Sequence, residues 1–140
     1  MPSLTRWYIK TALVYFILAL AAGVLMAAQQ AGVRVLPTIG LYPVYIHLLV
    51  EGWITLLIIG VAFWMFPVYT HEMPRGSLSL GWSSYLLLNA GLVLRIIAEP
   101  ANAMAAAERY WGILLAVAAF LQWAGGMAFI ANTWARVKGR

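Results

Sequence analysis

His47 and Glu51 lie four residues apart within an apolar run, residues 45–69, that is long enough to cross a bilayer. A histidine can carry a proton or ligate a metal, and a carboxylate can orient the histidine. One helical turn separates the two residues, which places both side chains on the same face. Ionisable side chains inside a membrane span are costly, so this pair marks a candidate functional site.

A second pair with the same spacing, Arg95 and Glu99, follows in a later apolar segment. If the two segments are antiparallel neighbours, all four ionisable groups reach the same outer third of the bilayer. One interpretation is a structural network in which Glu51 pairs with Arg95 and His47 bonds nearby, because buried charges are normally paired. The other interpretation is a ligand site.

The number of available ligands separates metal ions from haem. The chain has no cysteine and one further histidine, His71. A helix from His47 to His71 is about 36 Å long, which exceeds the ~30 Å of hydrocarbon, so the two histidines lie on opposite sides. A copper or zinc site usually needs three or four ligands. His47 and Glu51 of one chain supply two, so such a site requires the same pair from a second subunit. Haem iron needs only one or two axial ligands, and a two-fold homodimer supplies His47 twice.

Composition indicates a membrane protein. Of the 140 residues, 64% are apolar and 9% are charged, and the mean hydropathy is +0.87; a soluble domain carries about 25% charged residues. Long apolar blocks favour helices over the short alternating strands of a membrane barrel. The net charge of +5 is spread thinly along the chain, so it does not indicate nucleic-acid binding.

Four segments are long and apolar enough to span a bilayer: about residues 7–28, 44–66, 80–98 and 110–134. Prolines and glycines separate them, and Pro100 is expected to end the third helix. Small residues cluster in the first and fourth segments and predict close helix contacts. We therefore expect an all-α fold, an integral membrane four-helix bundle formed by residues 1–140 as one domain.

The distribution of cations predicts the orientation of this bundle. Four spans place both termini on one side, and that side collects Arg6, Lys10, Arg75, Arg136, Lys138 and Arg140. The other side holds Arg34 and Arg109, with Arg95 just inside the third helix. The positive-inside rule therefore predicts cytoplasmic termini in the cell membrane, which places His47 near the outer surface.

The string HLLVEGWITLLIIGVAFWMFP, residues 47–67, resembles a family of short bacterial membrane proteins related to subunit I of the haem-copper oxidases, of the cytochrome c oxidase and nitric oxide reductase type. The string LLLNAGLVLRIIAEP, residues 86–100, resembles the third helix of that family, so the resemblance covers about half of the chain. Relatives often have a second histidine where this chain has Tyr45, and a less charged residue at the position of Glu51. The matching positions are His47, Leu48, Leu49, Gly52, Trp53, Thr55 and residues 60–67.

The resemblance implies that His47 is an axial ligand of haem b near the outer end of the second helix. Glu51 is then expected to orient the imidazole, and Arg95, Arg34 or Arg109 to neutralise the haem propionates. The other ligands of the large oxidases come from helices that four spans cannot include, so no complete oxidase active site is expected. The implied function is electron transfer, or the sensing or handling of nitric oxide or oxygen.

Two other functions remain open. The chain can be a non-catalytic accessory or assembly subunit of a respiratory oxidase or nitric oxide reductase, in which the four ionisable groups are purely structural. It can also be a small transporter or proton-conducting bundle. Against conduction, the middle and inner parts of the helices offer little more than Asn89, Gln122 and Asn132.

Overall fold

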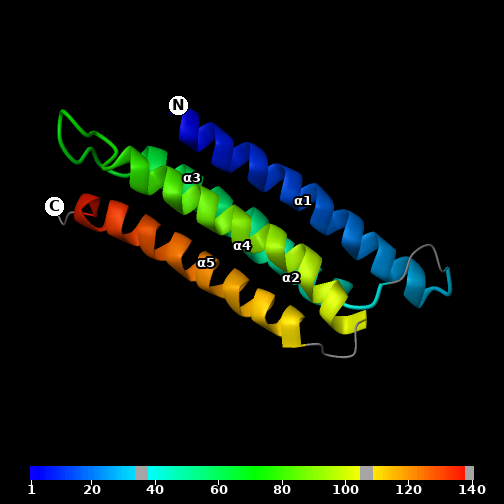
Figure 1. The fold of residues 1–140 in the computed structure, drawn as a ribbon. Coiled ribbons are helices and arrows are strands. Elements are labelled where there is room, and N and C mark those ends of the chain that lie inside the picture. Colours follow the sequence, from blue (N-terminus) through cyan, green and yellow to red (C-terminus); the bar gives the residue numbers. More distant parts are fainter. Residues whose placement is uncertain (34–37, 105–108, 138–140) are drawn as a thin grey trace.

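The computed structural model describes residues 1–33, 38–104 and 109–137, and within them the chain forms helices without strands (Figure 1). Four of the helical segments are long and apolar enough to span a membrane, which indicates a multi-pass membrane protein. The prediction of an all-α four-helix membrane bundle is therefore confirmed. The elements are α1 (Ser3–Gln30), α2 (Leu41–His47), the π-helix η1 (Leu48–Thr55), α3 (Leu56–Met65), α4 (Leu78–Met104), α5 (Arg109–Thr133) and the 3-10 turn η2 (Trp134–Arg136).

The elements α2, η1 and α3 follow one another without a break and form a single second span, residues 41–65. α1 packs on this second span, and α5 packs on α4. Figure 1 shows α1 and α5 on opposite sides of the second span and α4, with both chain ends at the same end of the bundle. The 66–77 connection lies at that end as well. We call the end of the bundle that holds both termini the terminal end, and the opposite end the distal end.

Two glycines of the second span let tyrosines of α1 approach its backbone. A Cβ atom at Gly52 would lie 2.8 Å from the Cβ atom of Tyr15, and one at Gly60 would lie 2.7 Å from the Cβ atom of Tyr8. Both tyrosines are buried. The Tyr8 hydroxyl donates to the Gly81 carbonyl of α4 at 3.3 Å. Each glycine therefore makes room for a side chain that links α1 to α4.

Replacing Gly52 with alanine is expected to destabilise the bundle by about 1–3 kcal/mol, because the added methyl group overpacks a filled contact. The new Cβ atom would meet Tyr15 and also Leu92, whose Cδ2 atom lies 2.9 Å away. The measurement is thermal unfolding in detergent by circular dichroism. Gly126→Ala in α5 is the matched control, since nothing lies within 4 Å of its Cβ position. Equal melting temperatures for the two variants would contradict the packing described.

α4 and α5 also meet through glycines. A Cβ atom at Gly91 would lie 2.6 Å from Gln122 Cγ and 2.8 Å from the Ala118 carbonyl oxygen, and one at Gly125 would lie 2.8 Å from Leu88 Cγ. Close contact of small residues is the usual way in which helices associate in lipid. The close contact predicted for the fourth segment therefore occurs against α4.

The outward face of α5 is apolar. The large exposed side chains on this helix are Tyr110, Ile113, Val117, Phe120, Trp123, Met127 and Ile130. Hydrocarbon tails are as apolar as these side chains, so the face is suited to direct contact with lipid.

The end of the third segment was predicted wrongly. α4 continues through Pro100 to Met104, four residues past the proline that was expected to stop it. Proline is disfavoured inside a helix but not forbidden, and tertiary packing overrides this preference. Here Gly40 packs against the turn: its Cβ position lies 2.8 Å from Pro100 Cα and 3.0 Å from the Glu99 carbonyl oxygen.

The sequence predicted an unbroken helix for the second span. The structure instead widens into a π-helix from Leu48 to Thr55. The hydroxyl of Thr55 donates to the Val50 carbonyl at 2.9 Å, five residues earlier. Gly52, in the middle of this segment, weakens the α-helical preference. π-Helical turns are rare in proteins, and those that occur often lie at functional sites. The widened turn begins directly after His47.

Candidate functional site

His47 ends α2, on the distal half of the second span, and its ring is held by two oxygen atoms. Its Nδ1 atom lies 2.8 Å from the Pro43 carbonyl oxygen and 3.0 Å from Oε1 of Glu99. A carbonyl oxygen only accepts hydrogen bonds, so we assign the ring proton to Nδ1. In the neutral imidazole, Nε2 then carries a free lone pair. The side chain is 31% exposed, so this histidine is partly accessible from outside the chain.

Glu99 joins His47 to the third and fourth spans. Oε1 of Glu99 also accepts from Arg95 NH1 at 3.1 Å, one turn earlier on α4. The Nε atom of Arg95 in turn donates to Gln122 Oε1 of α5 at 2.8 Å. Glu99 itself is buried, with its side chain only 7% exposed. The contacts therefore run from α2 through α4 to α5, and Arg95 compensates the buried carboxylate.

Two buried polar atoms of this network have no hydrogen-bond partner among the described residues, namely Oε2 of Glu99 and Nε2 of Gln122. Buried polar atoms are normally paired, and exceptions call for an explanation such as a ligand, an ion or an ordered water. The unpaired atoms lie on the two side chains that flank Arg95. The network thus retains one acceptor and one donor beyond what its internal contacts use.

The carboxylate beside the His47 ring is that of Glu99 and not that of Glu51. Glu51 makes no ion pair with the described residues, whereas Glu99 pairs with both His47 and Arg95. The predicted Glu51–Arg95 pair is therefore replaced by the Arg95–Glu99 pair. The π-helix η1 begins directly after His47 and rotates Glu51 relative to its place on an α-helix.

The predicted propionate partners have different positions. Arg95 is not a free cation, because its guanidinium is bound to Glu99 and Gln122. Arg109 begins α5 at the distal end and is exposed. Arg34 lies outside the described residues. His71 is exposed in the 66–77 connection at the terminal end, as the predicted separation of the two histidines requires.

A polar ladder between α1 and α4, unrecognised in the sequence, occupies the middle of the bundle. Thr11 Oγ1 and the Tyr85 hydroxyl lie 2.7 Å apart, and the Tyr15 hydroxyl donates to Asn89 Oδ1 at 2.9 Å. The available signal was spacing, since Thr11 and Tyr15 are one turn apart, as are Tyr85 and Asn89. The middle of the bundle therefore holds more polar side chains than the expected Asn89, Gln122 and Asn132.

The second unrecognised residue is Arg136, which the sequence placed only among the cations on the side of the termini. It is 1% exposed, and its guanidinium lies at the carboxyl end of α3, where it donates to backbone carbonyls. A cation at a helix C-terminus satisfies unpaired carbonyls and interacts favourably with the helix dipole. The acceptors are the carbonyl oxygens of Pro67 at 3.0 Å, Phe66 at 2.8 Å, Phe63 at 3.2 Å and Arg75 at 3.4 Å.

The described residues of the site offer one imidazole to a cofactor or a metal ion. Among the described residues, no group of three or more His, Cys, Asp or Glu side chains is arranged to hold a metal ion. A copper or zinc site would therefore need a second subunit. A single oriented imidazole with a free Nε2 is what one axial position of haem requires.

Fold and site together define the class of this protein: a multi-pass membrane bundle of four spans whose second span carries a histidine held by a buried carboxylate. No family model, curated protein or solved structure matches the chain.

Proposed function

We propose that the chain is a membrane haem b-binding protein in which Nε2 of His47 is an axial ligand of the iron. The observation that supports this most is the geometry at Nδ1, which has the Pro43 carbonyl at 2.8 Å and the Glu99 carboxylate at 3.0 Å. Histidines that bind metals usually donate their other ring N–H to a carbonyl or carboxylate. His47 has both kinds of acceptor.

The residues around His47 fix the ring and increase its basicity. Nδ1 donates its proton to the Pro43 carbonyl, with the Glu99 carboxylate 3.0 Å from the same nitrogen, and this keeps the lone pair on Nε2. Arg95 binds the same carboxylate oxygen and keeps the buried negative charge compensated, and Gln122 holds Arg95 from α5. The exposed cation Arg109, at the same end of the bundle, is the described residue best placed to meet a propionate.

The second axial ligand comes from His47 of a second copy in a two-fold homodimer. The other histidine of the chain, His71, lies at the opposite end of the bundle. A closed two-fold dimer presents the same residue twice, so one histidine per chain completes the set. The partial exposure of the His47 side chain is consistent with a ligand shared between subunits.

The protein acts in electron transfer, or in sensing or handling nitric oxide or oxygen, in the cell membrane with both termini in the cytoplasm. Bound haem b supplies a reversible one-electron couple and, where an axial position opens, a site for a diatomic gas. The cation excess at the terminal end supports this orientation. The resemblance to a fragment of haem-copper oxidase subunit I supports the cofactor, without the ligands of a complete oxidase centre.

The test is an absorption spectrum of the protein purified from haem-replete cells, with metal analysis of the same sample. We expect a Soret band and the visible bands of a six-coordinate haem b. A colourless protein that contains copper or zinc would replace haem with a metal site. A colourless, metal-free protein that co-purifies with an oxidase or nitric oxide reductase would favour the accessory-subunit function.

Replacing Glu99 with glutamine is expected to weaken haem binding by about 10–100-fold, the usual effect of losing the residue that orients a metal-bound histidine. The substitution keeps the shape of the side chain but removes the negative charge that lies 3.0 Å from His47 Nδ1 and accepts from Arg95. Haemin titration of the purified apoprotein, followed at the Soret band, measures the affinity. Glu72→Gln, in the exposed 66–77 connection, is the matched control. An affinity equal to that of the control would remove Glu99 from the site.

A further inference from the structure

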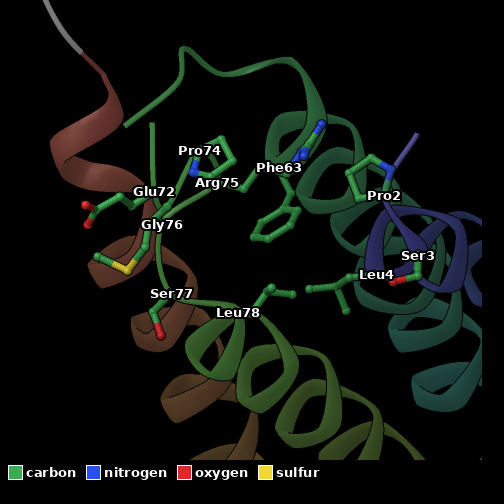
Figure 2. Close-up of a pocket in the computed structure, with 11 residues that line it drawn as sticks. Pro2, Ser3, Leu4, Phe63, Glu72, Pro74, Arg75, Gly76, Ser77 and Leu78 are labelled. Carbon is green, nitrogen blue, oxygen red and sulfur yellow. The ribbon is translucent and has the colours of Figure 1, made fainter. Parts of the chain in front are cut away.

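A pocket of about 440 Å³ opens at the terminal end, between the start of α1, the end of α3 and the start of α4. We call it the terminal pocket. Figure 2 shows Leu4, Phe63 and Leu78 pointing toward one another across it. These three side chains give it an apolar wall, while Ser3, Arg75 and Ser77 supply polar groups at its edge. The pocket is therefore amphipathic and lies where the membrane spans end.

Cations surround this pocket. Arg75 lines it, and the Nε atom of Arg75 is buried without a hydrogen-bond partner among the described residues. A smaller adjoining cleft of about 180 Å³, which shares Ser3, is lined by Arg6, Trp7 and Lys10. The described acidic residue at this end, Glu72, also lines the pocket, and Figure 2 shows its carboxylate directed away from Phe63 and Leu4. Arg75, with Arg6 and Lys10 of the adjoining cleft, therefore outnumbers the one described carboxylate at this end.

Two helix starts add to this positive potential. α1 begins at Ser3 and α4 at Leu78, both beside the pocket, and neither helix has an acidic residue in its first turn. The cap residue of α1, Pro2, provides no side-chain hydrogen bond. Unpaired N–H groups and the helix dipole favour an anion at such positions. At the start of α4, the Ser77 hydroxyl already accepts from the Leu80 N–H at 3.4 Å. An anionic group in the pocket would therefore be favoured by Arg75 and, of the two helices, mainly by α1.

We propose that the terminal pocket binds an anionic phospholipid, with its phosphate near Arg75 and its acyl chains on the apolar wall. The combination of features favours a lipid over a soluble anion. Leu4, Phe63 and Leu78 offer surface for hydrocarbon, and the adjoining Trp7, 55% exposed, is a residue type enriched at membrane interfaces. Basic pockets between membrane helices are known to bind acidic lipid headgroups. This site is independent of haem binding.

The test uses the full chain in a zwitterionic detergent and measures its melting temperature while phosphatidylglycerol is added. We expect a saturable rise with phosphatidylglycerol and none with phosphatidylcholine. Arg75→Gln should weaken the phosphatidylglycerol affinity about five-fold, since one cation near an acidic lipid contributes about 1 kcal/mol. Arg109→Gln, at the distal end, should leave the affinity unchanged.

A second variant tests the apolar wall separately. Leu78→Trp enlarges a side chain that lines the pocket and is 60% exposed, so it should fill the space while leaving the fold intact. Phosphatidylglycerol should then no longer raise the melting temperature. Equal stabilisation by phosphatidylcholine, equal stabilisation by soluble glycerol phosphate, or equal affinities for Arg75→Gln and Arg109→Gln would each overturn the proposal.

Discussion

His47→Ala is expected to yield a correctly folded protein that has lost its Soret band. In the proposed dimer this single substitution removes both axial ligands, so the loss of affinity should exceed the ~10–100-fold expected for Glu99→Gln. The measurement is the ratio of Soret to protein absorbance after purification from haem-replete cells. The variant should fold, because His47 is only half-buried. Circular dichroism of the same sample verifies that the helices are intact.

His71→Ala is the matched control for this experiment. His71 is exposed in the 66–77 connection, so the absorption spectrum of the His71→Ala variant should equal that of the wild type. A Soret band that survives in His47→Ala and disappears in His71→Ala would mean that the ligand had been assigned to the wrong histidine. A band that survives in both variants would exclude histidine ligation altogether.

Arg136→Met is expected to cause the largest loss of stability, at least about 2 kcal/mol, because hydrogen bonds to a charged group contribute ~1.5–3 kcal/mol each. The substitution leaves the carbonyls of Phe63, Phe66 and Pro67 without the donor that now binds them. It also removes a cation from the faces of two phenylalanine rings, 5.7 and 6.0 Å away. Thermal unfolding in detergent measures the effect.

Arg136→Lys separates charge from geometry at this position. Lysine keeps the positive charge at the end of α3 but cannot donate in several fixed directions, so its melting temperature should fall between those of the wild type and Arg136→Met. Wild-type stability in Arg136→Lys would show that charge alone is sufficient. Wild-type stability in Arg136→Met would contradict the capping role.

The sequence predicted the features that depend on local composition. Each apolar run is long enough to span the membrane, and all four predicted spans are present as helices. The boundaries were less accurate. α1 starts at Ser3 rather than near residue 7, and α4 passes through Pro100. The proline lies where Gly40 packs against the same turn, and this contact between distant residues has no signature in the local pattern.

The site could be predicted only in part, for the same reason. The outer-third grouping of His47, Arg95 and Glu99 followed from antiparallel spans, and these three residues do meet. Which carboxylate lies beside His47 depends on how the second span and α4 are rotated against each other, and the pattern of either segment alone does not encode this rotation. The burial of Arg136 depends on a contact between η2 and the end of α3, which are far apart in the sequence. Local residue spacing does not encode such a contact.

The most direct test of His47 as a shared axial ligand is the amount of haem per chain in the wild-type protein. Pyridine haemochrome analysis measures the haem, and amino-acid analysis of the same sample measures the chain. The proposal predicts haem b at one molecule for every two chains, with the protein running as a dimer in detergent. A chain that binds no haem under haem-replete conditions would contradict the proposal, as would a full haem held by each monomer.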